Sequence, residues 1–167
     1  HFLAESLDTY DQMLSLNIDA LVRLTYLCVP DMLARKVGGV INVASTAAFQ
    51  PVPYIAVYSA SKTFVLSFTE ALAEEYRKSG VRFLALCPGF TSTNFMTTAN
   101  ANTAGIPFAT PEDVAESGLT AFVKGKSYLV HGRANYLTTL LPRVLSRAAI
   151  TKIVADMFTN RVSPWSA

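Results

Sequence analysis

Val40-Ile41-Asn42-Val43-Ala44 is short, β-branched and almost continuously apolar, which predicts a strand covered on both of its faces. Val81-Arg82-Phe83-Leu84-Ala85-Leu86-Cys87 has the same character and is stopped by Pro88-Gly89. A third short strand is expected at residues 127–130. Strands of this type pack between helices in parallel sheets, so these three segments decide the fold class.

Helical patterns separate these strands. In the first of them apolar residues recur at three- and four-residue steps, although Pro30 is expected to kink or break the helix. Thr110-Pro111-Glu112-Asp113 predicts a helix start, because threonine caps a helix and proline fits its first turn. Helices are expected at residues 8–36, 59–79, 110–124 and 135–160. Helix and strand therefore alternate, which predicts an α/β fold with a parallel sheet.

A sheet of only three strands is thin. One of its edges would be left bare and apolar, which a stable domain rarely tolerates. The sequence therefore indicates a single domain over residues 1–167 whose sheet is incomplete. Residues 46–57 and 96–110 are expected to form loops, because they are rich in small, polar or proline residues and have little to bury.

The composition argues against several classes of function. A net charge of only +2 gives no reason to expect a nucleic-acid partner. Cys28 and Cys87 have no metal-ligand spacing around them, and both are expected to be buried in a reducing compartment. No apolar run reaches the roughly 18 residues that would span a bilayer. The expectation is a soluble cytoplasmic protein with no metal site and no membrane span.

Tyr58-Ser59-Ala60-Ser61-Lys62 has the clearest chemical pattern. Four residues apart on a helix, Tyr58 and Lys62 lie on one face. A free tyrosine has a pKa of about 10 and is a poor acid–base catalyst at neutral pH, but a nearby ammonium stabilises the phenolate and lowers that pKa. The pair is suited to pass a proton to or from an alcohol or carbonyl oxygen. A surface tyrosine–lysine pair on an amphipathic helix would have the same spacing.

Ser45 directly follows the first strand, thirteen residues before Tyr58. Open parallel sheets build their active sites outside the carboxyl ends of the strands. A hydroxyl at this point could hydrogen-bond the substrate oxygen that Tyr58 protonates. Ser45 could equally be a serine that opens or caps the loop.

Three segments together resemble motifs of the short-chain dehydrogenase/reductase family, in that family's order and spacing. Asn17, in the middle of the first helix, matches a fourth motif, and the resemblance covers nearly the whole chain. It implies a Rossmann-type doubly wound parallel sheet, of which this chain holds the C-terminal part, strands five to seven of seven. The three segments are Ile41-Asn42-Val43-Ala44-Ser45, Tyr58-Ser59-Ala60-Ser61-Lys62 and Pro88-Gly89-Phe90-Thr91-Ser92-Thr93.

The resemblance implies a catalytic role for each matched residue. Tyr58 would be the proton donor or acceptor, and Ser45 would orient and polarise the substrate oxygen. Lys62 would lower the tyrosine pKa and bind the nicotinamide ribose, while Asn17 would anchor a proton-relay water. The loop after the second strand would lie along the nicotinamide and pyrophosphate. The implied cofactor-binding residues are Tyr58, Lys62, Pro88, Gly89, Thr91 and Thr93.

The tail is similar to a broad bacterial subgroup of these reductases. The similarity rests on Leu129-Val130-His131-Gly132-Arg133-Ala134-Asn135 and Leu141-Pro142-Arg143, and His131 is interpreted there as a structural residue. Many members of the subgroup are thought to use NADPH, so NADP(H) is expected rather than NAD(H). The expected partners are a small-molecule carbonyl or alcohol substrate and further copies of the chain, as a homodimer or homotetramer.

One family motif has no counterpart. The glycine-rich turn Thr-Gly-x-x-x-Gly-x-Gly cradles the pyrophosphate at a helix N-terminus, and the eight glycines of this chain never have that spacing. The resemblance therefore implies that roughly 90 to 100 residues and four strands of the domain are missing. Two functions stay open: an oxidoreductase that moves hydride between NAD(P)(H) and a carbonyl/alcohol pair, and a catalytically silent binding protein or inactive fragment on the same scaffold.

Overall fold

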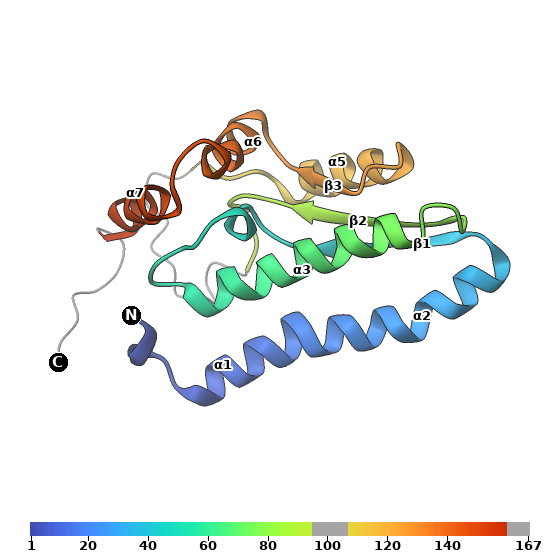
Figure 1. Cartoon of the computed structure of the whole chain (residues 1–167), viewed down its shortest axis with the longest axis horizontal. Coiled ribbons are helices and arrows are strands. Elements are labelled where there is room, and N and C mark those ends of the chain that lie inside the picture. The colour runs from blue at the N-terminus through green and yellow to red at the C-terminus, as the bar shows by residue number, and fades with distance from the viewer. Residues whose placement is uncertain (95–106, 160–167) are drawn as a thin grey trace.

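The computed structural model describes residues 1–94 and 107–159, in which helices and strands alternate along the chain (Figure 1). The first helical stretch is continuous through a π-helical turn, η2 (Ser15–Ala20), which joins α1 (Leu7–Leu14) to α2 (Leu21–Arg35). The other elements, in order, are η1 (Phe2–Ala4), β1 (Gly38–Val43), η3 (Thr46–Phe49), α3 (Ala56–Glu75), β2 (Val81–Cys87), α5 (Pro111–Val123), β3 (Tyr128–Val130), α6 (Arg133–Leu140), η4 (Leu141–Arg143) and α7 (Arg147–Thr159).

The three strands form one parallel sheet in the order β1-β2-β3. In the first pair Gly38 lies opposite Val81 and Val43 opposite Leu86. The carboxyl ends of the strands therefore meet at one edge of the sheet, the edge at which ligands bind in open α/β sheets. The outer side of β1 has no neighbouring strand in the described part of the chain, so the bare edge expected from the sequence is present.

The two faces of the sheet are covered by different helices. Figure 1 shows α2 and α3 on one side of the sheet and α5 on the other. Because side chains of a strand alternate between faces, Ala85 and Cys87 of β2 pack against α3, whereas Leu86 points at Gly118 of α5. Because β2 is buried on both faces, its amino-acid sequence is an almost continuous apolar run.

Two expectations about the helices differ from the structure. Pro30 does not end or interrupt α2, which continues to Arg35. A proline costs a helix one hydrogen bond to the carbonyl four residues earlier, here that of Tyr26, which lies on the exposed side of α2. The helix after the first strand begins at Ala56, before the expected Ser59, so that Tyr58 lies in its first turn.

The long first helix is more apolar than the interrupted apolar runs of its sequence suggest. Residues Leu7–Arg35 form 29 helical residues whose most apolar window has a mean hydropathy of 1.2, enough in length and composition to cross a membrane. A core helix of a soluble domain passes the same test, so this feature does not establish a span. The absence of a membrane span remains a prediction.

The two cysteines lie in different environments, and both are free thiols. Cys87 is fully buried at the end of β2, as expected, and burial raises the pKa of its thiol to about 12. The expectation for Cys28 was wrong, because this residue is exposed on α2. Thr25 and Val29 form the row that faces the sheet, and Cys28 falls beside that row.

This difference predicts the reactivity of the thiols. Only thiolates react rapidly with disulfide reagents, and access is required as well. Titration with Ellman's reagent is expected to modify Cys28 in the folded monomer and Cys87 only after unfolding. Rapid reaction of both thiols in the folded protein would contradict the burial of Cys87, and a Cys28→Ser variant identifies which thiol reacts.

Candidate active site

Ser45 lies at the carboxyl end of β1, where the chain turns into η3. Its hydroxyl caps that short helix by accepting a hydrogen bond from the backbone N–H of Ala47 at 3.1 Å. The residue is nearly buried and its side chain also hydrogen-bonds Tyr58. Ser45 is therefore both a capping serine and a neighbour of Tyr58. The two interpretations of Ser45 from the sequence, as a cap and as a residue near Tyr58, do not exclude each other.

Tyr58 and Lys62 occupy successive turns of α3 and lie beside the end of β1. The Lys62 Nζ atom is 5.8 Å from the centroid of the Tyr58 ring and donates a hydrogen bond to the backbone carbonyl of Val43 at 3.0 Å. Thr63 fixes the helix on the other side by donating to the carbonyl of Ala48 in η3 at 2.9 Å. The structure thus brings Ser45, Tyr58 and Lys62 together at one end of the sheet.

The electrostatics of the tyrosine differ from the expectation. Burial raises the pKa of Tyr58 above its ordinary value of 10.0, and the hydrogen bond from Ser45 lowers it only in part. Burial also lowers the pKa of Lys62, whose ammonium is bound to the Val43 carbonyl. The expected depression of the Tyr58 pKa by Lys62 is therefore not seen: burial raises this pKa, and the contribution that lowers it comes from Ser45.

Asn17 lies in the π-helical turn η2 and reaches the tyrosine–lysine helix. Its Nδ2 donates a hydrogen bond at 3.0 Å to the hydroxyl of Ser61, which in turn donates to the backbone carbonyl of Tyr58 at 2.7 Å. Ser61 is completely buried. Ser61 is not among the predicted site residues although it stands inside the quoted motif, because its bond to Asn17 depends on the packing of η2 against α3.

Ser61 and Ser59 offer a matched test of this link. Ser61→Ala is expected to lower the free energy of unfolding by about 1–2 kcal/mol, because the Asn17 amide loses its acceptor in a partly buried place. Ser59 is also buried, but its hydroxyl only bonds the Ala56 carbonyl of its own helix, so Ser59→Ala is expected to change stability by about 0.5 kcal/mol or less. Urea unfolding of both variants measures the difference, and equal effects would contradict the cross-helix link.

The loop after β2 lies next to Ser45. The backbone carbonyl of Pro88 accepts a hydrogen bond from the N–H of Thr46 at 3.0 Å. Thr91 bonds the Gly89 carbonyl through its hydroxyl at 3.2 Å, and its backbone pairs with Ala109 in a short bridge. Thr93 is exposed near the end of this described segment. Of the predicted loop 96–110, residues 96–106 lie outside the described residues.

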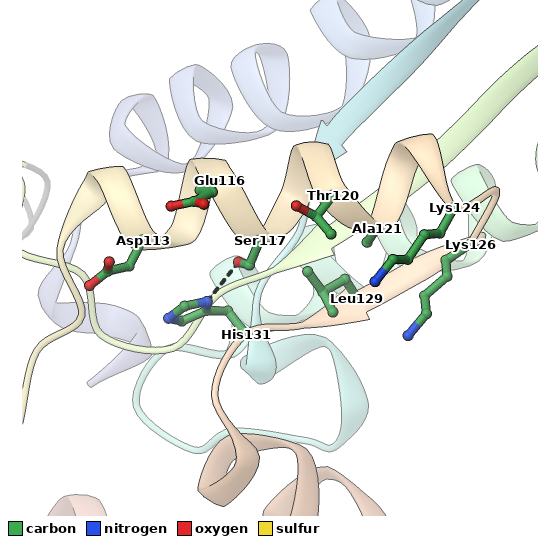
Figure 2. Close-up of a pocket in the computed structure, with 9 residues that line it drawn as sticks. All are labelled: Asp113, Glu116, Ser117, Thr120, Ala121, Lys124, Lys126, Leu129 and His131. Atoms are coloured by element: carbon green, nitrogen blue, oxygen red, sulfur yellow. Dashed lines mark hydrogen bonds between the residues drawn. The ribbon is translucent and has the colours of Figure 1, made fainter.

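A separate groove of about 580 Å³ opens between α5 and β3 (Figure 2). Within it, Ser117 Oγ and His131 Nδ1 are 2.8 Å apart. Ser117 Oγ also lies 3.0 Å from the Val114 carbonyl of its own helix, and with its one proton donated there the hydroxyl accepts a hydrogen bond from the imidazole. This supports a structural role for His131, and the groove contains none of the predicted site residues.

The donors beside Tyr58 fit the ribose of a nicotinamide cofactor. A lysine ammonium has three hydrogens, of which the Val43 carbonyl takes one in the described structure. Two donors therefore remain for the vicinal hydroxyls of a ribose, at a strand end where such cofactors lie in parallel sheets.

The sequence profile of a family described as short chain dehydrogenase matches residues 1–104, a segment that includes every predicted site residue. The chain belongs to the short-chain dehydrogenase family. Within it, the very-long-chain 3-oxoacyl-CoA reductase of Homo sapiens is 32% identical over 136 residues, which are 78% of this chain and 42% of the relative. The ketoacyl reductase HetN of Nostoc sp. is 32% identical over 148 residues, 86% of this chain and 50% of the relative. This short-chain dehydrogenase chain thus spans half or less of the length of these relatives.

Solved structures of the family share its fold. A short-chain dehydrogenase from Sphingobium yanoikuyae in complex with NADPH superposes with a TM-score of 0.73 at 20% identity, covering 99% of this chain and 62% of that one. A short chain dehydrogenase from Burkholderia cenocepacia in complex with NADP gives a TM-score of 0.76 at 20% identity, covering 90% and 62%. The three-stranded Rossmann-like arrangement is therefore that of the family.

Proposed function

We propose that this chain carries the catalytic part of an NADP(H)-dependent reductase that converts a carbonyl compound into its alcohol. The observation that carries the proposal is the hydrogen bond between Ser45 and Tyr58 at the end of β1, with Lys62 on the same side. Membership of a family whose similar members are named reductases supports it.

The residues of the site divide the reaction between them. The nicotinamide, when bound, supplies the hydride. Tyr58 would donate its phenolic proton to the carbonyl oxygen, and the Ser45 hydroxyl would stabilise the negative charge that develops on that oxygen. Lys62 would hold the ribose hydroxyls through its two remaining N–H groups. Asn17, whose Nδ2 is bound to Ser61, would reach a relay water through its amide oxygen or its backbone carbonyl.

The raised pKa of Tyr58 is compatible with a role as proton donor. A group that donates a proton must be protonated at the working pH, and burial keeps the phenol protonated throughout the neutral range. The reverse reaction requires the phenolate, which burial disfavours.

An apolar pair beside the loop supports a bulky, apolar carbonyl substrate. Phe90 and Phe108 pack edge to face with their ring centroids 6.1 Å apart, and more than a third of each side chain is exposed. They flank the Thr91–Ala109 bridge, next to the loop that follows Gly89. Relatives are named as a very-long-chain 3-oxoacyl-CoA reductase and as a 17-beta-hydroxysteroid dehydrogenase, and a very long acyl chain and a steroid are both large hydrocarbon groups. A 3-oxoacyl thioester is the substrate class we favour.

The rest of the domain and the cofactor preference are inferred from relatives. We propose that β1, β2 and β3 are strands five to seven of a seven-stranded sheet, with the dinucleotide held largely by preceding strands. Several structures of similar fold contain NADPH or NADP and one contains NAD, which favours NADP(H).

The chain is also proposed to associate with another copy of itself. Exposed apolar side chains on α2, among them Leu24 and Leu27, support burial against another copy of the chain.

Fluorescence titration of NADPH and NADH against the complete protein that contains these residues tests the proposal. Micromolar binding with preference for NADPH is expected, followed by NADPH oxidation when a 3-oxoacyl thioester is added. A folded protein that binds neither nucleotide would instead be a silent scaffold, and the reductase assignment would be lost.

A further inference from the structure

Asn135 lies in the first turn of α6, just after the end of β3. Its Nδ2 donates a hydrogen bond to the backbone carbonyl of His131 at 2.8 Å. The backbone N–H of His131 in turn donates to the carbonyl of Cys87 at 3.1 Å, which extends the ladder between β2 and β3 by one bond. The asparagine side chain is therefore fixed to the carboxyl ends of two strands.

The same side chain covers Gly89 in the loop after β2. A Cβ atom placed on Gly89 would lie 2.5 Å from Asn135 Nδ2 and 3.0 Å from its Cγ. The φ angle of Gly89 is not positive, so the glycine is required here by the space that Asn135 occupies rather than by its backbone conformation. The close fit of Asn135 on Gly89 limits where the loop can move.

The loop is held on its other side by the residue that follows Ser45. The Thr46 N–H binds the Pro88 carbonyl at 3.0 Å, so Pro88-Gly89 lies between Thr46 and Asn135. A shift of the loop toward α6 would pull on Thr46 and move Ser45 relative to Tyr58. Displacements of about 1 Å in an active site can cost roughly 100-fold in rate.

We propose that Asn135 is a positioning residue, which acts through Gly89 and Pro88 to set the place of the loop after β2 relative to Ser45 and Tyr58. The role rests on the proposed reductase function, because it concerns the geometry of that site. Asn135 itself contacts no reacting atom in this account.

The contact between Asn135 and Gly89 permits a reciprocal test in the complete protein. Gly89→Ala is expected to lower kcat/KM by about 100-fold, and Asn135→Ala by about 10-fold, because each displaces the loop. In the double variant the new methyl group occupies the space that the asparagine vacated. Its kcat/KM is therefore expected to exceed that of Gly89→Ala by at least about tenfold, the opposite of additive losses.

Two control variants separate this effect from a general loss of packing. Gly118→Ala also places a Cβ too close to a side chain, 2.9 Å from Leu86 Cδ2, but lies away from the loop. Thr138→Ala removes one hydrogen bond on α6, to the Asn135 carbonyl, without touching Gly89. Both are expected to keep kcat/KM within about threefold of the parent protein, because neither substitution changes the contact between Asn135 and Gly89.

NADPH binding supplies a readout besides activity. The Kd for NADPH, measured by fluorescence, is expected to rise about tenfold in Asn135→Ala and to recover in the double variant relative to Gly89→Ala. The melting temperature of each variant is measured alongside, so that a loss of stability is distinguished from a loss of NADPH binding. Additive losses in the double variant, or an unchanged Kd and kcat/KM in Asn135→Ala, would overturn the role of Asn135. A parent protein without NADPH binding or turnover would instead refute the proposed function, so the two failures are distinguishable.

Discussion

Replacement of Tyr58 by phenylalanine is expected to lower kcat by about 100- to 10,000-fold, the range that general acid catalysis contributes. The substitution removes only the hydroxyl, which is the atom group that bonds Ser45 and the proposed source of the proton. The aromatic ring keeps its packing beside Lys62, so the fold should be retained. Steady-state kinetics of NADPH oxidation, together with circular dichroism, measures both parts of this expectation.

The pH dependence of kcat provides a second test of Tyr58 as the acid. The acid must be protonated for reduction, so kcat of the parent protein should be level at neutral pH and fall as the pH rises through the pKa of Tyr58, which lies above 10.0. Tyr76→Phe is a matched control, because Tyr76 directly follows the far end of α3 and packs on Phe83. Turnover by Tyr58→Phe within tenfold of the Tyr76→Phe control would contradict the role of Tyr58.

Gly80→Ala is expected to cause the largest loss of stability, about 3 kcal/mol or more in the free energy of unfolding. Gly80 turns the chain from α3 into β2 with φ of +87°, a conformation that costs a residue with a side chain about 1–2 kcal/mol. A Cβ at this position would also lie 2.2 Å from the backbone carbonyl oxygen of Lys36, at the end of α2. Overpacking against a fixed atom adds about 1–3 kcal/mol.

Gly125 supplies the control for this prediction. Its φ is +71°, similar to that of Gly80, but a Cβ there would meet nothing within 4 Å. Gly125→Ala should therefore cost only the backbone conformation, about 1–2 kcal/mol. Denaturant unfolding of both variants separates the two contributions. Equal losses would show that the ends of α2 and α3 are not packed as closely as the structure has them.

The strands and Ser45 could be predicted because their signals are local. A β-branched apolar run bounded by glycine or proline marks a strand, and the residue after the run lies at the carboxyl end whatever the rest of the fold does. The same holds for the cap at Thr110, whose side chain accepts a hydrogen bond from the Asp113 N–H at 3.1 Å. Helical spacing predicts that Tyr58 and Lys62 share a face, whereas their catalytic roles are implied by the family resemblance.

The features of the site that could not be predicted from the sequence depend on contacts between residues far apart in the chain. Asn17 and Ser61 are 44 positions apart, and their hydrogen bond exists only because η2 packs against α3. The pKa of Tyr58 moves upward because tertiary packing buries the phenol, which spacing on one helix cannot reveal. The fit of Asn135 on Gly89 likewise joins α6 to the loop after β2. Such pairings require the fold before they can be inferred.

The most direct test of the reductase account is the fate of the hydride. NADPH carrying deuterium at C4 of the nicotinamide is incubated with the complete protein and a 3-oxoacyl thioester, and the alcohol is analysed by mass spectrometry. The account predicts one deuterium on the carbinol carbon when the labelled face is the one used, and none when the opposite face is labelled. Alcohol without deuterium from either labelled cofactor, or no alcohol at all from a protein that is folded and has bound NADPH, would contradict it.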